Sequence, residues 1–400
     1  MIKKGLTLFF TLWLFQSCHV GRFFLYNMAD VRDYKKFPKT ELHKSATPFF
    51  FKDVSQLNFA KLPKTVKGKR KTISFENAVK KTGTVAFIVI RNDSILYQWY
   101  RPGKQRSDIT TTFSMSKSFI SALVGIAIDE GYIKSVNDPI TNYLDFLDKN
   151  DPIGFDKVTI QNVLDMRSGI HFGENYFNPF GDIAKYYYGN HLKKYLKHLR
   201  METEPGKKFK YISLNTQLLG LILEKATGKS LTTYLQEKLW DPLGMEFDAS
   251  WSIDSKKNKT EKAFCCINGR AIDYAKLGRL YINKGKWNGK TLLSENWIRE
   301  TTTFTQRKNN FVYSNHWWHT RDYLLSQDSV KIKQPYYIDP YANVPNSYIV
   351  KPSGDFFAQG LFGQYLYVYP EKNIIIVRVA KREGWKVLWP ELFKEIARRN

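Results

Sequence analysis

A serine and a lysine three residues apart stand at the head of a strongly apolar segment of the chain. The segment reads TFSMSKSFI over residues 112–120, and nearly every position stays apolar as far as Ile128. If it is helical, Ser114 and Lys117 lie on one face of the first turn, because residues three apart are neighbours on a helix. A buried ammonium is costly unless it is paired or loses its proton, so burial would lower the pKa of Lys117. A neutral amine beside a hydroxyl is a base beside a nucleophile.

The composition of this segment predicts a buried helix. Hydroxyl residues between 111 and 114 are of types that cap helix starts, and Gly131 stands where the helix would end. A helix that is apolar on almost every side is a buried one. The alternative is that Lys117 extends its ammonium into solvent, which is the commoner outcome for an arbitrary Ser-x-x-Lys. Ser116 and Ser118 are interpreted as polar residues of the helix start, with Ser116 a weaker candidate for a hydrogen bond in the site.

Two further segments carry groups that such a site needs. Tyr211-Ile212-Ser213 comes just before a predicted amphipathic helix at residues 215–227, on a connection where a phenol can face a cleft. Gly360 and Gly363 open a predicted strand, and glycines let a substrate carbonyl approach main-chain N–H groups that stabilise an oxyanion. Taken singly, a tyrosine is more often a core or surface residue, and a glycine pair is as often a bulge.

The remaining pattern places strands at both ends of the chain and helices between them. Residues 84–90 and 95–100 predict a β-hairpin, residues 364–369 and 373–380 predict two more strands, and a last helix begins near residue 389. The region between, as far as about residue 285, is mostly helix and loop. This order predicts an α/β (α+β) fold with one sheet and a helical insertion between its strands.

Together these segments resemble the serine β-lactamase and penicillin-binding-protein superfamily, within it the class C and esterase-like branch, and most of all the 6-aminohexanoate-dimer hydrolases. The likeness covers most of residues 80–380. The motifs that carry it are Phe113–Phe119, Met166-Arg167-Ser168-Gly169-Ile170, Glu174-Asn175-Tyr176 with Asn178-Pro179, Tyr211-Ile212-Ser213, Pro242-Leu243-Gly244-Met245 with Asp248-Ala249-Ser250-Trp251, His316-Trp317-Trp318 and Gly360–Gln364. The resemblance implies the β-lactamase-like transpeptidase fold, in which helices flank an antiparallel sheet that carries an inserted, mainly helical subdomain.

The resemblance also implies roles for individual residues. Ser114 would be the acylated nucleophile, Lys117 its base and Tyr211 the group that passes a proton to the leaving group. The backbone N–H groups of Ser114 and Leu361 match the oxyanion hole of this superfamily. The positions implied to bind substrate are Tyr176, Ser213, Trp318 and Gly360. Tyr176 matches a tyrosine in a loop that closes over amide substrates, and Ser213 stands where β-lactamases usually carry asparagine.

The chain departs from the superfamily at two points that bear on substrate. β-Lactamases have Lys-Thr-Gly where this chain has Ala358-Gln359-Gly360, so the cation that would hold a carboxylate is missing. Dimer hydrolases carry an acidic residue in the tyrosine loop, and residues 182–188 offer no clear match. Neutral acyl groups are favoured by the aromatic surround of Tyr176, Tyr211, Trp317 and Trp318.

We therefore expect a serine hydrolase that cleaves a small-molecule ester or amide. One alternative is a peptidoglycan-directed D-amino-acid peptidase or esterase, and another is a β-lactamase. A third alternative, from a different class, is a non-catalytic binding lipoprotein on the same scaffold. The presence of serine, lysine and tyrosine together argues against a non-catalytic protein, because a binding role does not require all three residues.

Composition and charge favour a protein with a highly solvated surface. The 400 residues carry a net charge of +25, and the lysines are scattered along the chain, so we expect no nucleic-acid partner. No metal and no cofactor are expected, and His316 and His319 are interpreted as structural or pocket-lining residues. Cys265 and Cys266 are adjacent and are expected not to bridge each other, so no disulfide framework is predicted.

The N-terminus has the pattern of an export signal. Lys3 and Lys4 precede an apolar run at residues 5–15 that is too short to span a bilayer. It ends at Gln16-Ser17-Cys18, which resembles a bacterial lipoprotein signal whose cleavage leaves Cys18 lipidated. The expected organisation is a signal peptide at 1–17, a tether and N-terminal extension at 18–80, and a hydrolase domain at 81–400 with its helical subdomain at about 115–285. The expected location is the bacterial cell envelope, with the chain held at a membrane by its lipid; the oligomeric state stays open.

The mature chain is expected to partition with membranes and to begin at an acylated Cys18. The variant Cys18→Ser lacks the acceptor sulfur, so it is expected in the soluble fraction with unchanged hydrolase activity. Cell fractionation and mass spectrometry of the N-terminal peptide measure both properties. An unprocessed wild-type chain in the cytoplasm would contradict this prediction.

Overall fold

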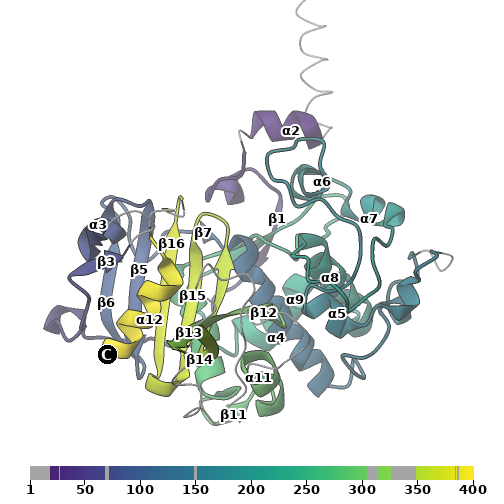
Figure 1. The fold of residues 1–400 in the computed structure, drawn as a ribbon. Helices are drawn as coiled ribbons and strands as arrows, with labels where there is room; N and C mark the ends of the chain where they lie inside the picture. Colours follow the sequence, from purple (N-terminus) through teal and green to yellow (C-terminus); the bar gives the residue numbers. More distant parts are fainter. Residues whose placement is uncertain are drawn as a thin grey trace, which may run out of the picture.

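A sheet of eight strands runs through the molecule and separates two hydrophobic cores (Figure 1). The computed structural model describes residues 19–26, 28–67, 72–147, 151–303, 313–325, 348–382, 384 and 387–400. In spatial order the sheet contains β12 (Tyr313–Ser314), β13 (Trp317–Leu325), β14 (Tyr348–Gly360), β15 (Gln364–Tyr369), β16 (Ile374–Ala380), β5 (Thr84–Arg91), β6 (Ser94–Tyr100) and β2 (Lys52–Asp53). All neighbours pair antiparallel except β2 and β6, which are parallel.

Helices cover both faces of this sheet and fill the region between its strands. They are α2 (His19–Leu25), α3 (Phe75–Lys80), α4 (Ser116–Asp129), α5 (Ile160–Leu164), α6 (Asp182–Tyr188), α7 (Leu192–Tyr195), α8 (Ser213–Thr227), α9 (Leu231–Leu235), α10 (Ala271–Ile282), α11 (Glu295–Thr302) and α12 (Trp389–Arg399). One face of the sheet packs against α3 and α12, and the other packs against α4 and α10 (Figure 1). This mainly antiparallel sheet with flanking helices confirms the predicted fold class.

The strand β5 shows why these residues form the centre of the sheet. Ala86, Ile88 and Ile90 lie in the larger core, whereas Phe87 and Val89 lie in the core beneath α12, because side chains alternate along a strand. A strand covered on both faces needs an apolar residue at nearly every position. The predicted hairpin of β5 and β6, the strands β15 and β16, and the C-terminal helix α12 are confirmed.

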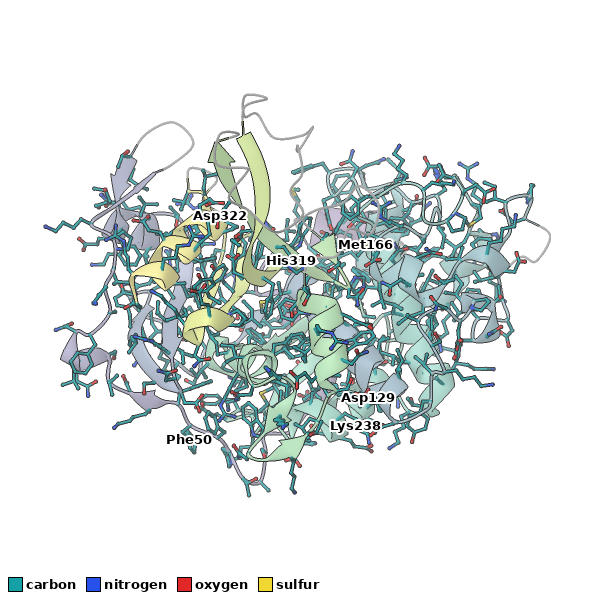
Figure 2. All side chains as sticks on the ribbon, turned by 60° about the horizontal axis from the view of Figure 1, so that its bottom comes forward. Phe50, Asp129, Met166, Lys238, His319 and Asp322 are labelled. Carbon is teal, nitrogen blue, oxygen red and sulfur yellow. A yellow bond between two sulfur atoms is a disulfide. The ribbon has the colours of Figure 1, made fainter. Side chains whose placement is uncertain are left out.

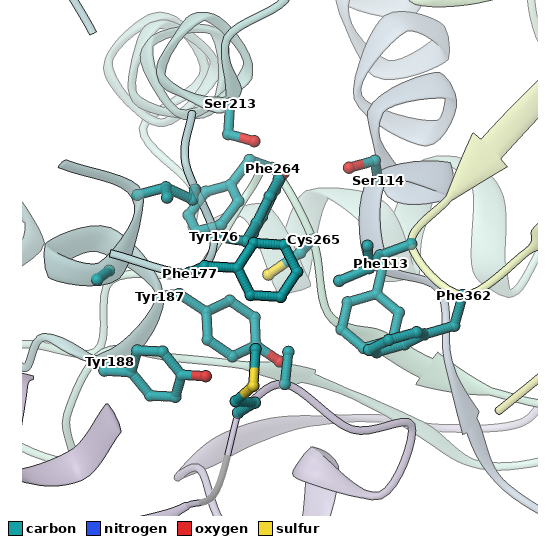
Figure 3. A pocket seen from close by; sticks show the side chains of 15 residues that line it. Phe113, Ser114, Tyr176, Phe177, Tyr187, Tyr188, Ser213, Phe264, Cys265 and Phe362 are labelled. Atoms are coloured by element: carbon teal, nitrogen blue, oxygen red, sulfur yellow. The ribbon is translucent and has the colours of Figure 1, made fainter. Parts of the chain in front are cut away.

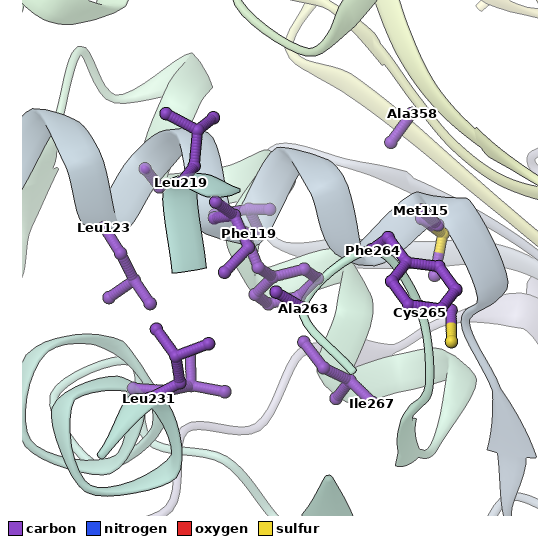
Figure 4. Packing of buried hydrophobic residues seen from close by; sticks show 14 of the residues in the cluster. Met115, Phe119, Leu123, Leu219, Leu231, Ala263, Phe264, Cys265, Ile267 and Ala358 are labelled. Atoms are coloured by element: carbon purple, nitrogen blue, oxygen red, sulfur yellow. The ribbon is translucent and has the colours of Figure 1, made fainter. Parts of the chain in front are cut away.

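The helix α4 passes through the larger core and packs against α8. Its residues from Ser116 to Ala127 are buried, as predicted for a helix that is apolar on all sides. Figure 4 shows Phe119 and Leu123 of α4 and Leu219 of α8 within this core. The prediction of a side-chain cap at 111–114 is wrong: a 3₁₀ turn, η3 (Phe113–Met115), leads directly into α4, and no side-chain cap hydrogen bond forms.

Three further details differ from the prediction. The helix α8 begins at Ser213, earlier than expected, and is buried as far as Leu223 rather than amphipathic, because α4, α5 and α9 surround it. Gly360 ends β14 instead of opening a strand, and the turn at 361–363 leads into β15. The N-terminal part and the middle of the chain also contain short strands outside the large sheet. These are β1 (Lys39–Leu42), β8 (Ala249–Ser252), β9 (Ile267–Gly269) and β7 (Thr110–Thr111) in one small sheet, and the pairs β10 (Lys286–Trp287) with β11 (Lys290–Thr291) and β3 (Thr65–Lys67) with β4 (Thr72–Ser74).

The N-terminal part of the chain packs against the rest of the molecule. The strand β1 pairs with β8, β2 pairs with β6, and α2 contacts α6. The predicted signal peptide and Cys18 lie outside the described residues. Within the described part of the chain, no helix combines the length and the apolar character needed to cross a bilayer. The predicted domain boundaries stay predictions.

Candidate active site

Ser114 and Lys117 are in contact where η3 meets α4. Lys117 Nζ lies 3.0 Å from Ser114 Oγ. The same amine donates to the carbonyl oxygen of Phe264 at 2.8 Å and lies 3.4 Å from Ser213 Oγ. Only 1% of Lys117 is exposed, so the amine is buried instead of reaching solvent. Ser114 is half-buried, which leaves its hydroxyl open to a small molecule.

Burial sets the charge state of Lys117. Removal from water disfavours the ammonium form and lowers the pKa of Lys117 to about 7, although the carboxylate of Glu174 acts in the opposite direction. Near neutral pH much of the amine is therefore unprotonated and able to accept the Ser114 proton. Burial also lowers the pKa of the neighbouring His316, to about 3, which leaves that imidazole a far weaker base.

Tyr211 stands just before α8, and its ring centroid lies 5.3 Å from Lys117 Nζ. Burial raises the pKa of Tyr211, and the nearby Ser114 hydroxyl only partly opposes this effect. The phenol therefore stays protonated near neutral pH and can pass a proton on. Trp318 of β13 stacks on the Tyr211 ring, with centroids 5.7 Å apart and planes inclined by 26°.

Glu174 is a site residue that the sequence analysis missed. Its Oε1 accepts hydrogen bonds from Ser213 Oγ and the Tyr176 hydroxyl, both at 2.5 Å, and its Oε2 accepts from the Ser213 backbone N–H at 2.8 Å. One carboxylate thus ties the loop that carries Tyr176 to the start of α8. The signal in the sequence was its position two residues before Tyr176. Asp182, the acidic residue of segment 182–188, instead pairs with Lys185.

The backbones of η3 and β14 meet beside Ser114. A Cβ atom on Gly360 would lie 2.2 Å from the carbonyl oxygen of Thr112, so only glycine allows this approach. Phe113, which precedes Ser114, has φ of +45°, a left-handed conformation that is uncommon for a bulky residue. Such strained residues concentrate at functional sites, where the surrounding packing holds them.

The turn at 361–363 is held from behind by two buried polar side chains. The guanidinium of Arg378 donates to the carbonyl oxygen of Gly363 at 2.7 Å. The side-chain amide of Gln364 donates to the carbonyl oxygen of Leu361 at 3.1 Å and also bridges to Ala380. These bonds fix the backbone of the turn between β14 and β15, next to η3.

The loop that accepts the Lys117 hydrogen bond contains a disulfide. Cys265 and Cys266 are bonded to each other, so the prediction that they do not bridge is wrong. Cys266 has φ of +74°, and the sharp bend brings the two neighbouring sulfurs together. A bridge between adjacent residues closes a small ring, which restricts the backbone next to the Phe264 carbonyl. The adjacency of the two cysteines was the available signal.

Ser114 lines a cavity whose described wall does not include Lys117 (Figure 3). Its empty volume is about 750 Å³, part of which is open to solvent. The predicted site residues that line it are Ser114, Tyr176, Ser213 and Leu361. Most of the remaining wall is apolar or aromatic, with Phe113, Tyr187, Phe264 and Phe362 labelled in Figure 3. None of the fifteen described residues that line the cavity has a charged side chain.

Some predicted site residues lie elsewhere. Tyr211, Trp318 and Gly360 adjoin the reacting groups but are not part of the cavity wall. The prediction that Trp317 belongs to the aromatic surround of the site is wrong. Its ring packs in the core, with its centroid 4.7 Å from that of the Tyr281 ring. Because side chains alternate along β13, Trp317 and Trp318 face opposite sides of the sheet.

The nearby hydroxyl and imidazole groups are structural. Ser116 Oγ donates to the carbonyl oxygen of Ala263 at 3.3 Å, so its hydrogen bond lies outside the site. Ser118 Oγ donates to the carbonyl oxygen of His316 at 2.7 Å. His316 and His319 are buried, and neither lines the cavity. Within the described residues, no group of three or more His, Cys, Asp or Glu side chains could hold a metal ion.

Comparison with protein families identifies the kind of enzyme. The family model described as Beta-lactamase matches residues 73–399, which is most of the chain. The chain belongs to the beta-lactamase family. The resemblance inferred from the motifs is thereby confirmed, and the protein is a beta-lactamase-family serine hydrolase.

Individual relatives of this beta-lactamase-family chain agree with that result. The 6-aminohexanoate-dimer hydrolase of Paenarthrobacter ureafaciens is 28% identical over 305 residues, which cover 70% of this chain and 74% of the relative. A Bacillus anthracis protein that is provisionally described as a 6-aminohexanoate-dimer hydrolase superposes with a TM-score of 0.69 at 20% identity. The superposition covers 92% of each chain. A class C beta-lactamase superposes with a TM-score of 0.54 at 18% identity and covers 81% of this chain and 91% of its own.

The depressed pKa of Lys117 predicts how activity depends on pH. The amine must be unprotonated to act as a base, so kcat/KM for a neutral ester is expected to rise through about pH 7 and then to level off. Lys117→Arg is expected to be nearly inactive, because a guanidinium does not give up its proton. Steady-state rates between pH 5 and 9, combined with thermal unfolding to check the fold, measure both effects.

A second buried lysine provides the control for this experiment. Burial also lowers the pKa of Lys262 to about 7, but its amine bonds the carbonyl oxygen of Tyr187 and not Ser114. The variant Lys262→Met is expected to keep the midpoint of the pH profile even if its rate changes. An active Lys117→Arg enzyme, or a midpoint that moves only with Lys262, would remove Lys117 as the base.

Proposed function

We propose that this beta-lactamase-family hydrolase cleaves a neutral ester or amide through an acyl-enzyme formed on Ser114. The observation that carries the proposal is the 3.0 Å contact between Lys117 Nζ and Ser114 Oγ in surroundings that lower the lysine pKa to about 7. A lysine that is buried away from water and lies within hydrogen-bond distance of a half-buried hydroxyl has the unprotonated amine and the position of a general base.

The reaction would begin with transfer of the Ser114 proton to the neutral amine of Lys117. Ser114 Oγ then attacks the substrate carbonyl, and the backbone N–H groups of Ser114 and Leu361 are proposed to stabilise the oxyanion. Tyr211 is protonated near neutral pH, so it is suited to donate a proton to the departing alcohol or amine and to take one back from the Lys117 ammonium. Water would then attack the acyl carbon and give a proton to the neutral Lys117 amine. That proton would pass to Ser114 Oγ as its bond to the acyl carbon breaks and the carboxylic acid leaves.

The chemistry of the cavity supports a neutral substrate. No charged side chain lines it among the described residues, and an unpaired charge in such surroundings is costly. The Ser213 and Tyr176 hydroxyls both donate to Glu174, so they can only accept hydrogen bonds from a substrate, while most of the remaining wall offers apolar contact. The relative from Paenarthrobacter ureafaciens is named for hydrolysis of an amide dimer, which agrees with ester or amide cleavage on this scaffold.

The same features argue against a β-lactam or a peptidoglycan carboxylate as the preferred substrate. Ala358 stands at the position of the missing lysine. Gln359, at the position of the threonine, donates its side-chain amide to the Tyr365 hydroxyl at 3.0 Å. Glu174, the acidic group near the reacting pair, would repel a carboxylate. A carboxylate substrate would meet no cation among the described residues of the cavity wall.

We also propose a location at a bacterial membrane, through a lipid on Cys18. This part of the proposal is supported by the basic start, the short apolar run and the Ser17-Cys18 pair of the sequence. It is independent of the chemistry assigned to Ser114.

Ser114→Ala is expected to lower kcat for a short-chain aryl ester by about 10⁴-fold or more, because loss of the nucleophile removes the acyl-enzyme route. Ser116→Ala is the matched control, since Ser116 lies two residues away, bonds Ala263 and does not line the cavity. A phosphonate probe should label wild type at Ser114, as mass mapping would show. If Ser114→Ala keeps more than about a hundredth of the wild-type rate, another residue is the nucleophile.

Neutral short-chain esters are expected to be hydrolysed measurably, with little turnover of penicillins or cephalosporins. The reason is the lack of a cation to pair with the carboxylate that these antibiotics carry. Side-by-side steady-state assays with one enzyme preparation decide the preference. Efficient cephalosporin hydrolysis with negligible esterase activity would contradict the substrate assignment.

A further inference from the structure

Part of the cavity wall comes from residues that precede the beta-lactamase match. The match begins at residue 73, yet Met28 and Ala29 line the same cavity as Ser114. Met28 has φ of +66°, a conformation that is uncommon for a residue other than glycine and that needs support from its surroundings. We call the described residues 19–26 and 28–42, which contain α2, Met28 and β1, the N-terminal segment.

Aromatic packing holds the N-terminal segment against the cavity. The Phe23 ring lies edge-on to Tyr188 at 5.3 Å, and the Phe37 ring lies edge-on to Tyr187 at 5.2 Å. Tyr187 and Tyr188 belong to α6, and both also line the cavity. The same two rings therefore form the cavity wall on one side and the contact with the N-terminal segment on the other.

Buried polar groups fix the same contact. The Tyr187 hydroxyl donates to Asp33 Oδ2 at 2.7 Å, and Asp33 is only 2% exposed. Lys262 Nζ donates to the Tyr187 carbonyl oxygen and lies 4.0 Å from the centre of the Phe37 ring. Buried groups of this kind hold a contact in one geometry, because leaving any of them unpaired is costly. The Tyr187 hydroxyl, being bonded to Asp33, is turned toward the segment and not toward a ligand.

The positions of the reacting groups decide which part of a substrate occupies the cavity. Ser114 and Leu361, which would hold the carbonyl, both line the cavity. Tyr211, which would protonate the leaving group, does not line it and stacks instead on Trp318. The leaving group therefore belongs on the side of Tyr211, and the acyl group belongs in the cavity.

We infer that the N-terminal segment completes an acyl-binding cavity, and that the cavity takes an unbranched aliphatic acyl chain of a neutral ester. This inference rests on the proposed function of Ser114. Away from the serines the wall offers apolar contact from Ile183, Ala184, Phe264 and Phe362 and no charge. Met28, which is 38% exposed, and Phe177, which is 78% exposed, are the large apolar side chains of the wall that reach solvent. Met28 is thus a specificity-determining residue at the edge of the acyl site.

The test is a series of aryl esters that share one leaving group and differ in acyl length from acetyl to dodecanoyl. Burial of each further methylene is worth about fourfold in kcat/KM, so the wild-type values are expected to rise steeply with chain length until the cavity is filled. Met28→Trp replaces the thioether chain at the edge of the acyl site by a larger indole ring. It is expected to lower the ratio of octanoyl to acetyl kcat/KM by about tenfold, as loss of about two methylene contacts would.

Two further variants separate the parts of the inference. Phe50→Trp is the control, because Phe50 also precedes the family match, is 66% exposed, lies at the periphery and does not line the cavity (Figure 2). It is expected to keep the wild-type ratio. Ala184→Leu narrows the cavity from α6, and should lower the ratio whether or not the N-terminal segment takes part.

The possible results distinguish this inference from the proposed function. Rates that are independent of acyl length, or that follow the length of the alcohol instead, would overturn the acyl assignment while Ser114 still forms the acyl-enzyme. A ratio that changes in Ala184→Leu but not in Met28→Trp would overturn the role of the N-terminal segment. Loss of all ester hydrolysis, with no adduct on Ser114 in the wild type, would overturn the proposed function itself.

Discussion

The removal of one lysine side chain from water is the constraint on which this structure depends. Lys117 lies at the start of a helix whose next residues are buried, and 1% of it is exposed. Burial of an ammonium is costly, and the chain does not offset that cost with a direct carboxylate partner; the Phe264 carbonyl and hydroxyl groups receive its hydrogen bonds instead. These partners tolerate a neutral amine, so the energy of desolvation appears as a lowered pKa and not as an ion pair.

A site of this kind must be assembled from backbones that are distant in the sequence. Ser114 follows a left-handed Phe113, the Lys117 acceptor sits in a loop bent by the Cys265–Cys266 disulfide, and Gly360 approaches Thr112 too closely for any side chain. Each of these local conformations is unfavourable alone and is held by packing elsewhere. Glu174 also holds distant segments together, because its carboxylate accepts three hydrogen bonds that join the Tyr176 loop to α8.

The sequence predicted well wherever one local pattern settles the structure. The apolar run after Lys117, the alternating hairpin of β5 and β6 and the strands β15 and β16 could all be recognised from spacing. The predictions failed where contacts between segments distant in the sequence determine the structure. Nothing local to Trp317 shows that it turns away from Trp318, because that depends on the register of β13 in the sheet. The helix α8 looked amphipathic because its polar residues, such as Asn215, find buried partners that belong to other segments.

The large positive charge of the chain and its uncharged cavity act at different distances. A net charge of +25 draws anions toward the surface and raises the rate of encounter, but screening limits this field to about 8 Å at physiological salt. Selection at Ser114 depends instead on desolvation within the cavity, where an anion would lose water and find no cationic partner among the described lining residues. Attraction from a distance therefore cannot turn an anion into a substrate. The charge therefore affects how often an anion meets the surface, while the apolar wall selects the molecule that reacts.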